Sequence, residues 1–127
     1  MATILFEKAS GTGNGFRVHL DVRLRTRLSR SFFRTDYVPD TLTEIGKKIC
    51  EGIAEIPGID REIMVSTYSL ETGVGYAFDP KLVIEQVIAV IQSVGEKVQL
   101  GYLLPENRIK LVDQLEVIAV EDMRANG

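Results

Sequence analysis

The sequence predicts a single α+β domain in which strands and helices alternate along the chain. Residues 16–28 alternate apolar and polar side chains with a period of two, which is typical of a strand that buries one face. Residues 42–56 and 82–94 repeat apolar side chains every three or four positions, as amphipathic helices do. With 127 residues, 45% of them hydrophobic, the chain is long enough to bury one core.

The first two predicted elements are a strand over 3–9 and the strand over 16–28. Between them, Asn14-Gly15 favours a hairpin turn, because a primed turn needs positive φ at both central residues. A glycine-rich phosphate-binding loop is the alternative interpretation of residues 11–15. Such a loop opens a helix, whereas a strand pattern follows here, so we predict the turn. Residues 29–39 are expected to form a linker.

The first helix is predicted to begin near Thr41 and Glu44, which have the spacing of a capping box. Pro57-Gly58 should end this helix. One face of this helix carries the apolar residues Leu42, Ile45, Ile49, Ile53 and Ile56. The second helix, 82–94, is introduced by Asp79 as N-cap and Pro80 as first helical residue.

The remaining predicted strands follow the two helices. Strands over 62–70 and 74–78 are separated by a turn at 71–73, and a further strand is expected over 97–104. For residues 105–127 we favour a short helical turn followed by a strand at 115–120, although residues 109–118 also fit a helix. The order from 16 to 104 is then β-α-β-β-α-β, the ferredoxin-like layout of two helices on one face of an antiparallel sheet.

The domain organisation that follows is one domain over 1–127. Its core is 16–104, its extra N-terminal strand is 3–9, and its C-terminal extension is 105–127. The single cysteine, Cys50, excludes an intrachain disulfide and fits a reducing compartment. The N-terminus lacks the features of a secretory signal, and no apolar run reaches the length of a membrane span. We therefore expect a cytoplasmic protein with no membrane contact.

Arginine is concentrated in one short part of the chain. Six of the nine arginines lie within residues 16–34, which carry a formal charge of +5 against −3 for the whole chain, so the remainder carries −8. The predicted outward face of the strand over 16–28 carries Arg17, Arg23, Arg25 and Arg27. We expect these four residues to bind carboxylates or phosphates of a partner through bidentate hydrogen bonds.

Two other interpretations of the arginines stay open. They could form a solvated sheet face. They could also pair with acidic residues such as Glu62, Glu71 or the Glu116 and Glu121 region, in the same chain or in a second copy. Neutralisation by carboxylates is attractive because four arginines in a row on one face repel each other.

Several segments together resemble the heavy-metal-associated superfamily. They are Ile56-Pro-Gly-Ile59, Ile63-Met-Val-Ser-Thr-Tyr68, Glu71-Thr-Gly-Val74 and Tyr76-Ala-Phe-Asp-Pro80. The resemblance covers about residues 16–95 and implies a ferredoxin-like fold. Metal-carrying members hold a soft ion with a Cys-x-x-Cys pair between the first strand and the first helix. Residues 29–39 contain neither cysteine nor histidine, so we expect no metal site and no cofactor.

An aromatic pair suggests a different function. Gly75-Tyr-Ala-Phe78 matches the aromatic strand of the RNA-recognition motif, in which two rings stack on bases. Tyr76 and Phe78 would then bind single-stranded RNA beside the arginines. The alternative is that both rings pack against the helices, as large aromatic side chains on half-buried strands usually do.

No catalytic arrangement is evident. His19 and Asp21 share a strand face, but no serine or cysteine is placed near them by the sequence. We therefore expect a non-catalytic interaction or regulatory module that binds an acidic protein partner or self-assembles, most simply as a dimer. The first alternative is a single-stranded RNA-binding module, and the second is a small-ligand sensor or metal-related accessory protein.

Overall fold

The computed structural model describes residues 2–8, 14–28, 31–60, 62–75, 77–94, 98–103 and 109–112. Its strands are β1 Ala2–Lys8, β2 Asn14–Leu20, β3 Ser31–Phe33, β4 Ile63–Val65, β5 Ser69–Val74, β6 Val98–Leu103 and β7 Ile109–Val112. Its helices are α1 Glu44–Ala54 and α2 Pro80–Ser93. Within these residues no helix is both long and apolar enough to cross a membrane.

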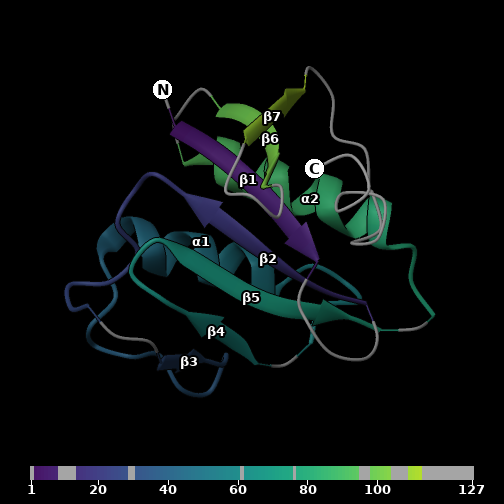
Figure 1. Ribbon diagram of the computed structural model, residues 1–127. Coiled ribbons are helices and arrows are strands. Elements are labelled where there is room, and N and C mark those ends of the chain that lie inside the picture. The colour runs from purple at the N-terminus through teal and green to yellow at the C-terminus, as the bar shows by residue number, and fades with distance from the viewer. Residues whose placement is uncertain are drawn as a thin grey trace.

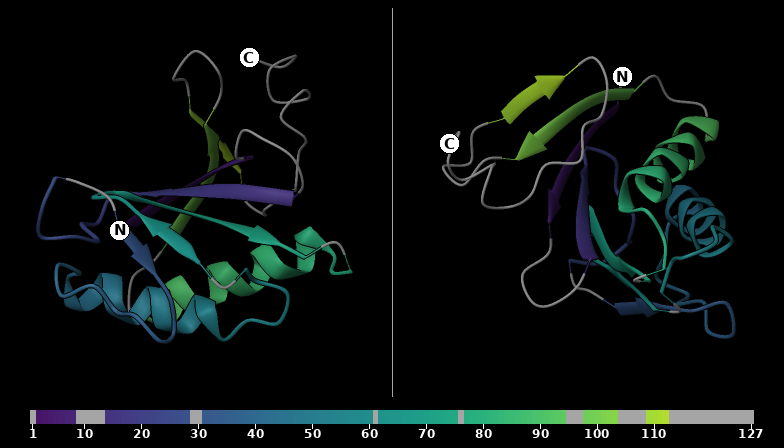
Figure 2. Two further views of the ribbon diagram at one scale, coloured as in Figure 1. Left: turned by 90° about the horizontal axis from the view of Figure 1, so that it is seen from below. Right: turned by 90° about the vertical axis from the view of Figure 1, so that its right-hand side faces the viewer.

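The strands form one mixed sheet in the order β3-β4-β5-β2-β1-β6-β7 (Figure 1). Both helices lie against the same face of the sheet, as the two views of Figure 2 show. The α+β class is confirmed, and β2-α1-β4-β5-α2-β6 follows the predicted order of elements. The arrangement is compatible with a ferredoxin-like fold.

The N-terminal strand lies inside the sheet and not at its edge. β1 is inserted between β2 and β6, antiparallel to β2 and parallel to β6. The expectation of a purely antiparallel core sheet is therefore wrong. Alternation of apolar residues predicts that a segment is a strand, but it does not specify which strands become its neighbours.

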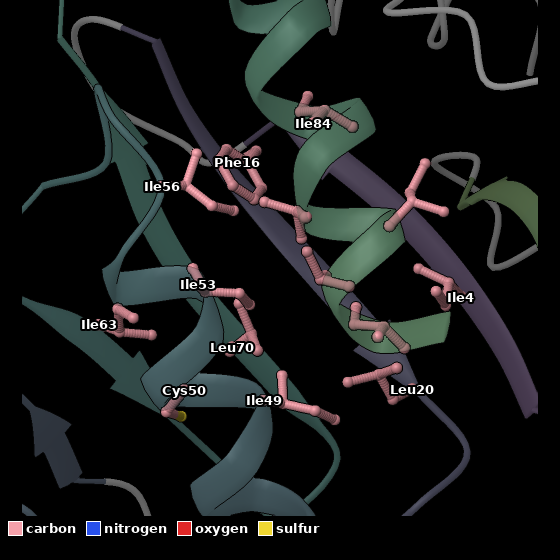
Figure 3. Close-up of a cluster of buried hydrophobic side chains, with 14 of the residues drawn as sticks. Ile4, Phe16, Leu20, Ile49, Cys50, Ile53, Ile56, Ile63, Leu70 and Ile84 are labelled. Carbon is pink, nitrogen blue, oxygen red and sulfur yellow. The ribbon is translucent and has the colours of Figure 1, made fainter. Parts of the chain in front are cut away.

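The core lies between the sheet and the helices. The inward residues of β2, which are Phe16, Val18 and Leu20, are buried, as predicted from their even positions. Figure 3 shows Phe16 and Leu20 facing the apolar stripes of the helices. The buried residues of the two stripes include Ile49, Ile53, Ile56, Ile84, Val87, Ile88 and Ile91. The predicted helical periodicities are thus confirmed by the burial of their apolar faces.

The caps of the helices agree with the prediction in one case and differ in the other. Asp79 caps α2, since its Oδ1 accepts a hydrogen bond from the backbone N of Lys81 at 3.0 Å. α1 is capped by Thr43 and not by Thr41: Oγ1 of Thr43 accepts from the backbone N of Gly46 at 3.0 Å. The hydroxyl of Thr41 is engaged by Arg25 instead.

The first core strand is shorter than predicted, because β2 ends at Leu20 and residues 21–28 leave the sheet. The neighbouring strand β5 begins at Ser69, opposite His19, so β5 offers β2 no ladder partner beyond that point. Leu28, which the alternation placed on the buried face, is 84% exposed.

The predicted turn at 71–73 is wrong. Residues 71–73 lie inside β5, which pairs with β2 on one side and β4 on the other. The turn falls at residues 66–69, where the backbone N of Ser66 donates to the carbonyl of Ser69 at 2.7 Å. The predicted strand over 74–78 is therefore also wrong. Pairing of Thr72 and Gly73 with Phe16 and Gly15 of β2 outweighs the local turn preference of Thr72-Gly73.

Three other local predictions change. β1 and β2 form the expected hairpin, but Asn14 and Gly15 belong to β2 and pair with β5, and residues 9–13 lie outside the described part. The expected linker 29–39 contains β3, which pairs with β4. Residues 109–112 are the strand β7 and not a helical turn, and the strand expected at 115–120 lies outside the described residues.

A glycine closes the turn after α1, and it provides a test of this packing. Gly58 has φ +96°, and a Cβ built there would lie 2.6 Å from Cγ of Phe78. We expect Gly58→Ala to lower the free energy of unfolding by about 1–3 kcal/mol, through backbone strain and the clash with the ring. Urea unfolding followed by circular dichroism measures this.

Gly75→Ala is the matched control for that measurement. A Cβ at Gly75 would lie 3.5 Å from Cδ2 of the same ring, an ordinary contact distance. This variant should lose less than about 1 kcal/mol. Equal losses for the two variants would contradict the role given to Gly58.

Candidate functional site

Most of the arginines singled out by the sequence lie in one loop, residues 21–28, which we call the arginine loop. It begins directly after β2 and crosses the N-terminal end of α1, where Arg25 forms an isolated β-bridge with Leu42. The backbone N of Leu24 donates to the carbonyl of Thr67 at 2.7 Å, which attaches the loop to the turn between β4 and β5. The loop therefore contacts two segments that are distant in sequence.

Three threonines hold the backbone of the arginine loop in place. Thr41 accepts on its carbonyl from the backbone N of Thr26 at 2.8 Å. The hydroxyl of Thr43 donates to the carbonyl of Arg23 at 2.8 Å while it caps α1. The hydroxyl of Thr67 donates to the carbonyl of Arg27 at 3.0 Å. Because backbone groups of Arg23, Thr26 and Arg27 have fixed partners, the loop has an ordered conformation without a bound partner.

The loop also lies tightly against α1. A Cβ built on Gly46 would collide with the backbone carbonyl of Leu24, and the side chain of Leu24 is fully buried. A residue with a side chain at position 46 would have to push the loop away from the helix, since a backbone carbonyl cannot rotate aside as a side chain can.

Arg25 faces inward. The residue is only 4% exposed, and its Nη2 donates to Oγ1 of Thr41 at 2.6 Å. Its carbonyl accepts from Nε of Arg23 at 2.9 Å. The predicted outward position of Arg25 is thus wrong, because the residue is buried and its guanidinium binds Thr41.

Arg17 is separated from the other three arginines. It lies in β2 directly opposite Glu71 of β5, and its Nη2 is 3.4 Å from Oε2 of Glu71. The side chains are 34% and 21% exposed. Intrachain pairing with Glu71, one of the alternatives left open by the sequence, is therefore confirmed for Arg17. The four arginines do not share one strand face.

Arg23 and Arg27 remain at the surface, and two large side chains are exposed beside them. Leu28 follows Arg27, and Tyr68, which is 48% exposed, adjoins the Thr67 that holds the loop. Exposed carboxylates of Asp21, Asp40 and Glu44 are also present in or next to the loop. The formal charge of residues 21–28 themselves is +2. The surface thus combines guanidinium groups with apolar contact area.

Phe78, one ring of the predicted base-stacking pair, does not lie on a strand. β5 ends at Val74, and the backbone N of Phe78 donates to the carbonyl of Gly75 at 3.0 Å, which closes a turn before α2. The ring of Phe78 lies against Gly58 and Gly75 and is partly exposed. Tyr76 lies outside the described residues. A stacking platform of the RNA-recognition type needs rings on adjacent positions of the sheet face, which this turn does not provide.

Cys50 is buried on the inner face of α1. Burial raises the pKa of its thiol to about 12, with a smaller contribution from the nearby charge of Glu51. The thiol is protonated at neutral pH and lies in the core beside Ile49 and Ile53. Within the described part of the chain, no three His, Cys, Asp or Glu side chains are grouped so as to hold a metal ion.

Sequence reasoning missed the residues that shape the site. Thr41, Thr43 and Thr67 fix the loop. Thr41 and Thr43 lie at the predicted start of a helix, but that signal indicates a helix cap and not a contact with the loop. Tyr68 joins the surface through the turn between β4 and β5, and nothing local to residues 66–68 indicates that. Both features depend on contacts between segments about 20 to 40 residues apart.

Comparisons with known proteins give a likeness of fold. No family profile matches the chain, and no curated protein matches it. Its structure is similar to the crystal structure of protein SAV1430 from Staphylococcus aureus, with a TM-score of 0.52 and 16% sequence identity. The similarity covers 69% of this chain and 96% of that one. At this level of identity the likeness concerns the fold alone.

The inward position of Arg25 predicts that it stabilises the protein. Arg25→Ala should lower the free energy of unfolding by about 2–3 kcal/mol, since it removes a hydrogen bond from a charged donor and the packing of a buried side-chain stem. Arg27→Ala, at an exposed position of the same loop, should change it by less than about 0.5 kcal/mol. Urea unfolding of both variants tests this, and similar losses would contradict the distinction.

The buried thiol predicts low reactivity of Cys50. In the folded protein, Ellman's reagent at about pH 8 should react far more slowly than in guanidinium chloride, because the thiolate is the reacting species. The thiol has its ordinary pKa, 9.0, when exposed and about 12 when buried. Its contribution to stability is therefore complete below pH 9 and is lost as the pH rises towards 12. Rapid reaction of the folded protein would contradict the burial.

Proposed function

We propose that this protein is a non-catalytic interaction module whose arginine loop binds the carboxylates of an acidic protein partner. The observation that supports this is the combination of two exposed arginines, Arg23 and Arg27, with a loop backbone held by Thr41, Thr43 and Thr67. Guanidinium groups on an ordered backbone can meet a carboxylate with both nitrogens while losing little conformational entropy.

The apolar part of the surface supports a protein partner over a simple polyanion. Leu28 and Tyr68 expose large side chains: Leu28 follows Arg27 in the loop, and Tyr68 follows the Thr67 that bonds the carbonyl of Arg27. Tyrosine and arginine are among the residues that contribute most to protein interfaces. A phosphate polymer would bind the arginines but leave Leu28 and Tyr68 exposed. An acidic protein segment that also carries apolar residues would contact both the arginines and these two side chains.

The fold forms part of the proposal. We propose a ferredoxin-like core with an inserted N-terminal strand, which the order from β2 to β6 supports. The resemblance of residues 16–95 to the heavy-metal-associated superfamily supports the same assignment. The loop that carries metal ligands in that superfamily corresponds here to the segment between β2 and α1, which contains arginine and threonine but no cysteine or histidine. This supports binding of a partner in place of a soft metal ion.

A fluorescence anisotropy experiment tests the proposed function. The probe is a fluorescein-labelled peptide of repeating Glu-Leu-Glu units. Arg23→Gln combined with Arg27→Gln should weaken binding by about tenfold, because charge-assisted hydrogen bonds are lost at two positions. The two residues are exposed, so the fold should be retained, which circular dichroism checks.

The matched control removes two positive charges elsewhere on the surface, through Arg34→Gln and Lys81→Gln. This control should weaken binding by less than about twofold, since surface charges at a distance are largely screened. Equal weakening by both double variants would contradict a specific site. Oligouridylate, tested at two salt concentrations, represents the RNA alternative. Tighter binding of it than of the peptide, with a steep salt slope, would favour that alternative.

A further inference from the structure

The register of the sheet connects the arginine loop to the C-terminal part of the chain. Leu20, the last residue of β2, is opposite Ile4 of β1. Ile4 is opposite Leu100 of β6, and Leu100 is opposite Val112, the last residue of β7. These residues form one row across β2, β1, β6 and β7. The chain therefore leaves β2 and β7 at the same end of the sheet.

The distance between the end of β2 and the end of β7 is short compared with the length that the chain after Val112 can span. Three strand spacings separate Leu20 from Val112, or about 14 Å in the plane of a sheet. Residues 113–122 come directly after Val112, and ten extended residues span up to about 33 Å. The segment 113–122 can thus reach the arginine loop of its own chain.

The composition of residues 113–122 complements the arginine loop. The segment has the sequence Asp-Gln-Leu-Glu-Val-Ile-Ala-Val-Glu-Asp and carries a formal charge of −4, with no lysine or arginine. Its apolar residues, Leu115 and the run 117–120, lie between carboxylates at both ends of the segment. The loop offers the matching chemistry: Arg23 and Arg27 for carboxylates, and Leu28 and Tyr68 for apolar side chains. This is the acidic, apolar kind of ligand that the surface fits.

We propose that the acidic C-terminal segment, residues 113–122, binds the arginine loop of its own chain and competes with the partner. This inference rests on the proposed function, because it assigns an internal competitor to the same site. Binding within one chain is favoured by a high effective concentration when the connection spans the two sites. A partner then binds with reduced apparent affinity, since only the fraction of molecules with an open loop can accept it.

The first experiment locates the segment in the full-length protein. A nitroxide is attached at Asn126→Cys, just beyond the segment, and Cys50 stays unlabelled because it is buried. In ¹⁵N-labelled protein at low concentration, the amide signals of residues 21–28 should broaden strongly. The broadening should be lost when Arg23→Gln and Arg27→Gln are added. It should persist with the control pair Arg34→Gln and Lys81→Gln.

Two outcomes of this experiment overturn the inference. Unchanged signals for residues 21–28 would show that the segment does not occupy the loop. Broadening that appears when ¹⁵N-labelled protein without nitroxide is mixed with nitroxide-labelled protein, at the same strength as within one chain, would show that a second copy supplies the segment.

The second experiment measures competition with the Glu-Leu-Glu peptide. The full chain is compared with a variant whose tail carboxylates are neutralised: Asp113→Asn, Glu116→Gln, Glu121→Gln and Asp122→Asn. The variant should bind the peptide at least about threefold more tightly, as expected when an internal competitor is removed. The matched control neutralises four exposed carboxylates elsewhere: Glu51→Gln, Glu55→Gln, Glu62→Gln and Glu85→Gln. It should change the affinity by less than about 1.5-fold.

These measurements separate the failure of this inference from the failure of the proposed function. If the peptide binds in an Arg23- and Arg27-dependent way but neutralising the tail has no effect beyond the control, only the internal competition is overturned. If the peptide does not bind even when the tail is neutralised, the proposed function is overturned and the inference with it.

Discussion

The central strand β2 is the element on which the rest of the structure depends. It pairs with β1 on one side and β5 on the other, so each of its edges is hydrogen-bonded. Its inward residues Phe16, Val18 and Leu20 are buried under the helices. A strand with two paired edges and one buried face has a single register, since a slip of one residue would expose the apolar side chains. The end of β2 at Leu20 then determines where the arginine loop begins.

The arginines show how burial gives different roles to identical residues. Arg17 is half-buried and paired with Glu71, Arg25 is buried against Thr41, and Arg23 and Arg27 face outward. The arginines differ in burial because the loop leaves the sheet after Leu20. Beyond that point, odd and even positions no longer lie on opposite faces of a sheet. Two of the four predicted binding residues therefore serve the structure, and two remain available to a partner.

The surface around the arginine loop unites three separate segments of the chain. The loop itself, Thr41 and Thr43 before α1, and Thr67 in the turn between β4 and β5 are linked by hydrogen bonds. Such a surface presents its exposed groups on a fixed backbone, which lowers the entropic cost of binding. The chain outside residues 16–34 carries a formal charge of −8. Val112 at the end of β7 lies in the same row of the sheet as Leu20 at the end of β2.

Much of the fold follows from local patterns in the sequence. The periods of β2, α1 and α2 specified the buried residues, and Asp79-Pro80 specified the start of α2, because burial of one face and capping of a helix are properties of neighbouring residues. The position of β1 between β2 and β6, the extent of β5 through Thr72-Gly73, and the burial of Arg25 were decided by the tertiary structure. Each of these depends on which distant segment forms hydrogen bonds with a strand edge or with a side chain. A local pattern in the sequence does not determine that distant partner.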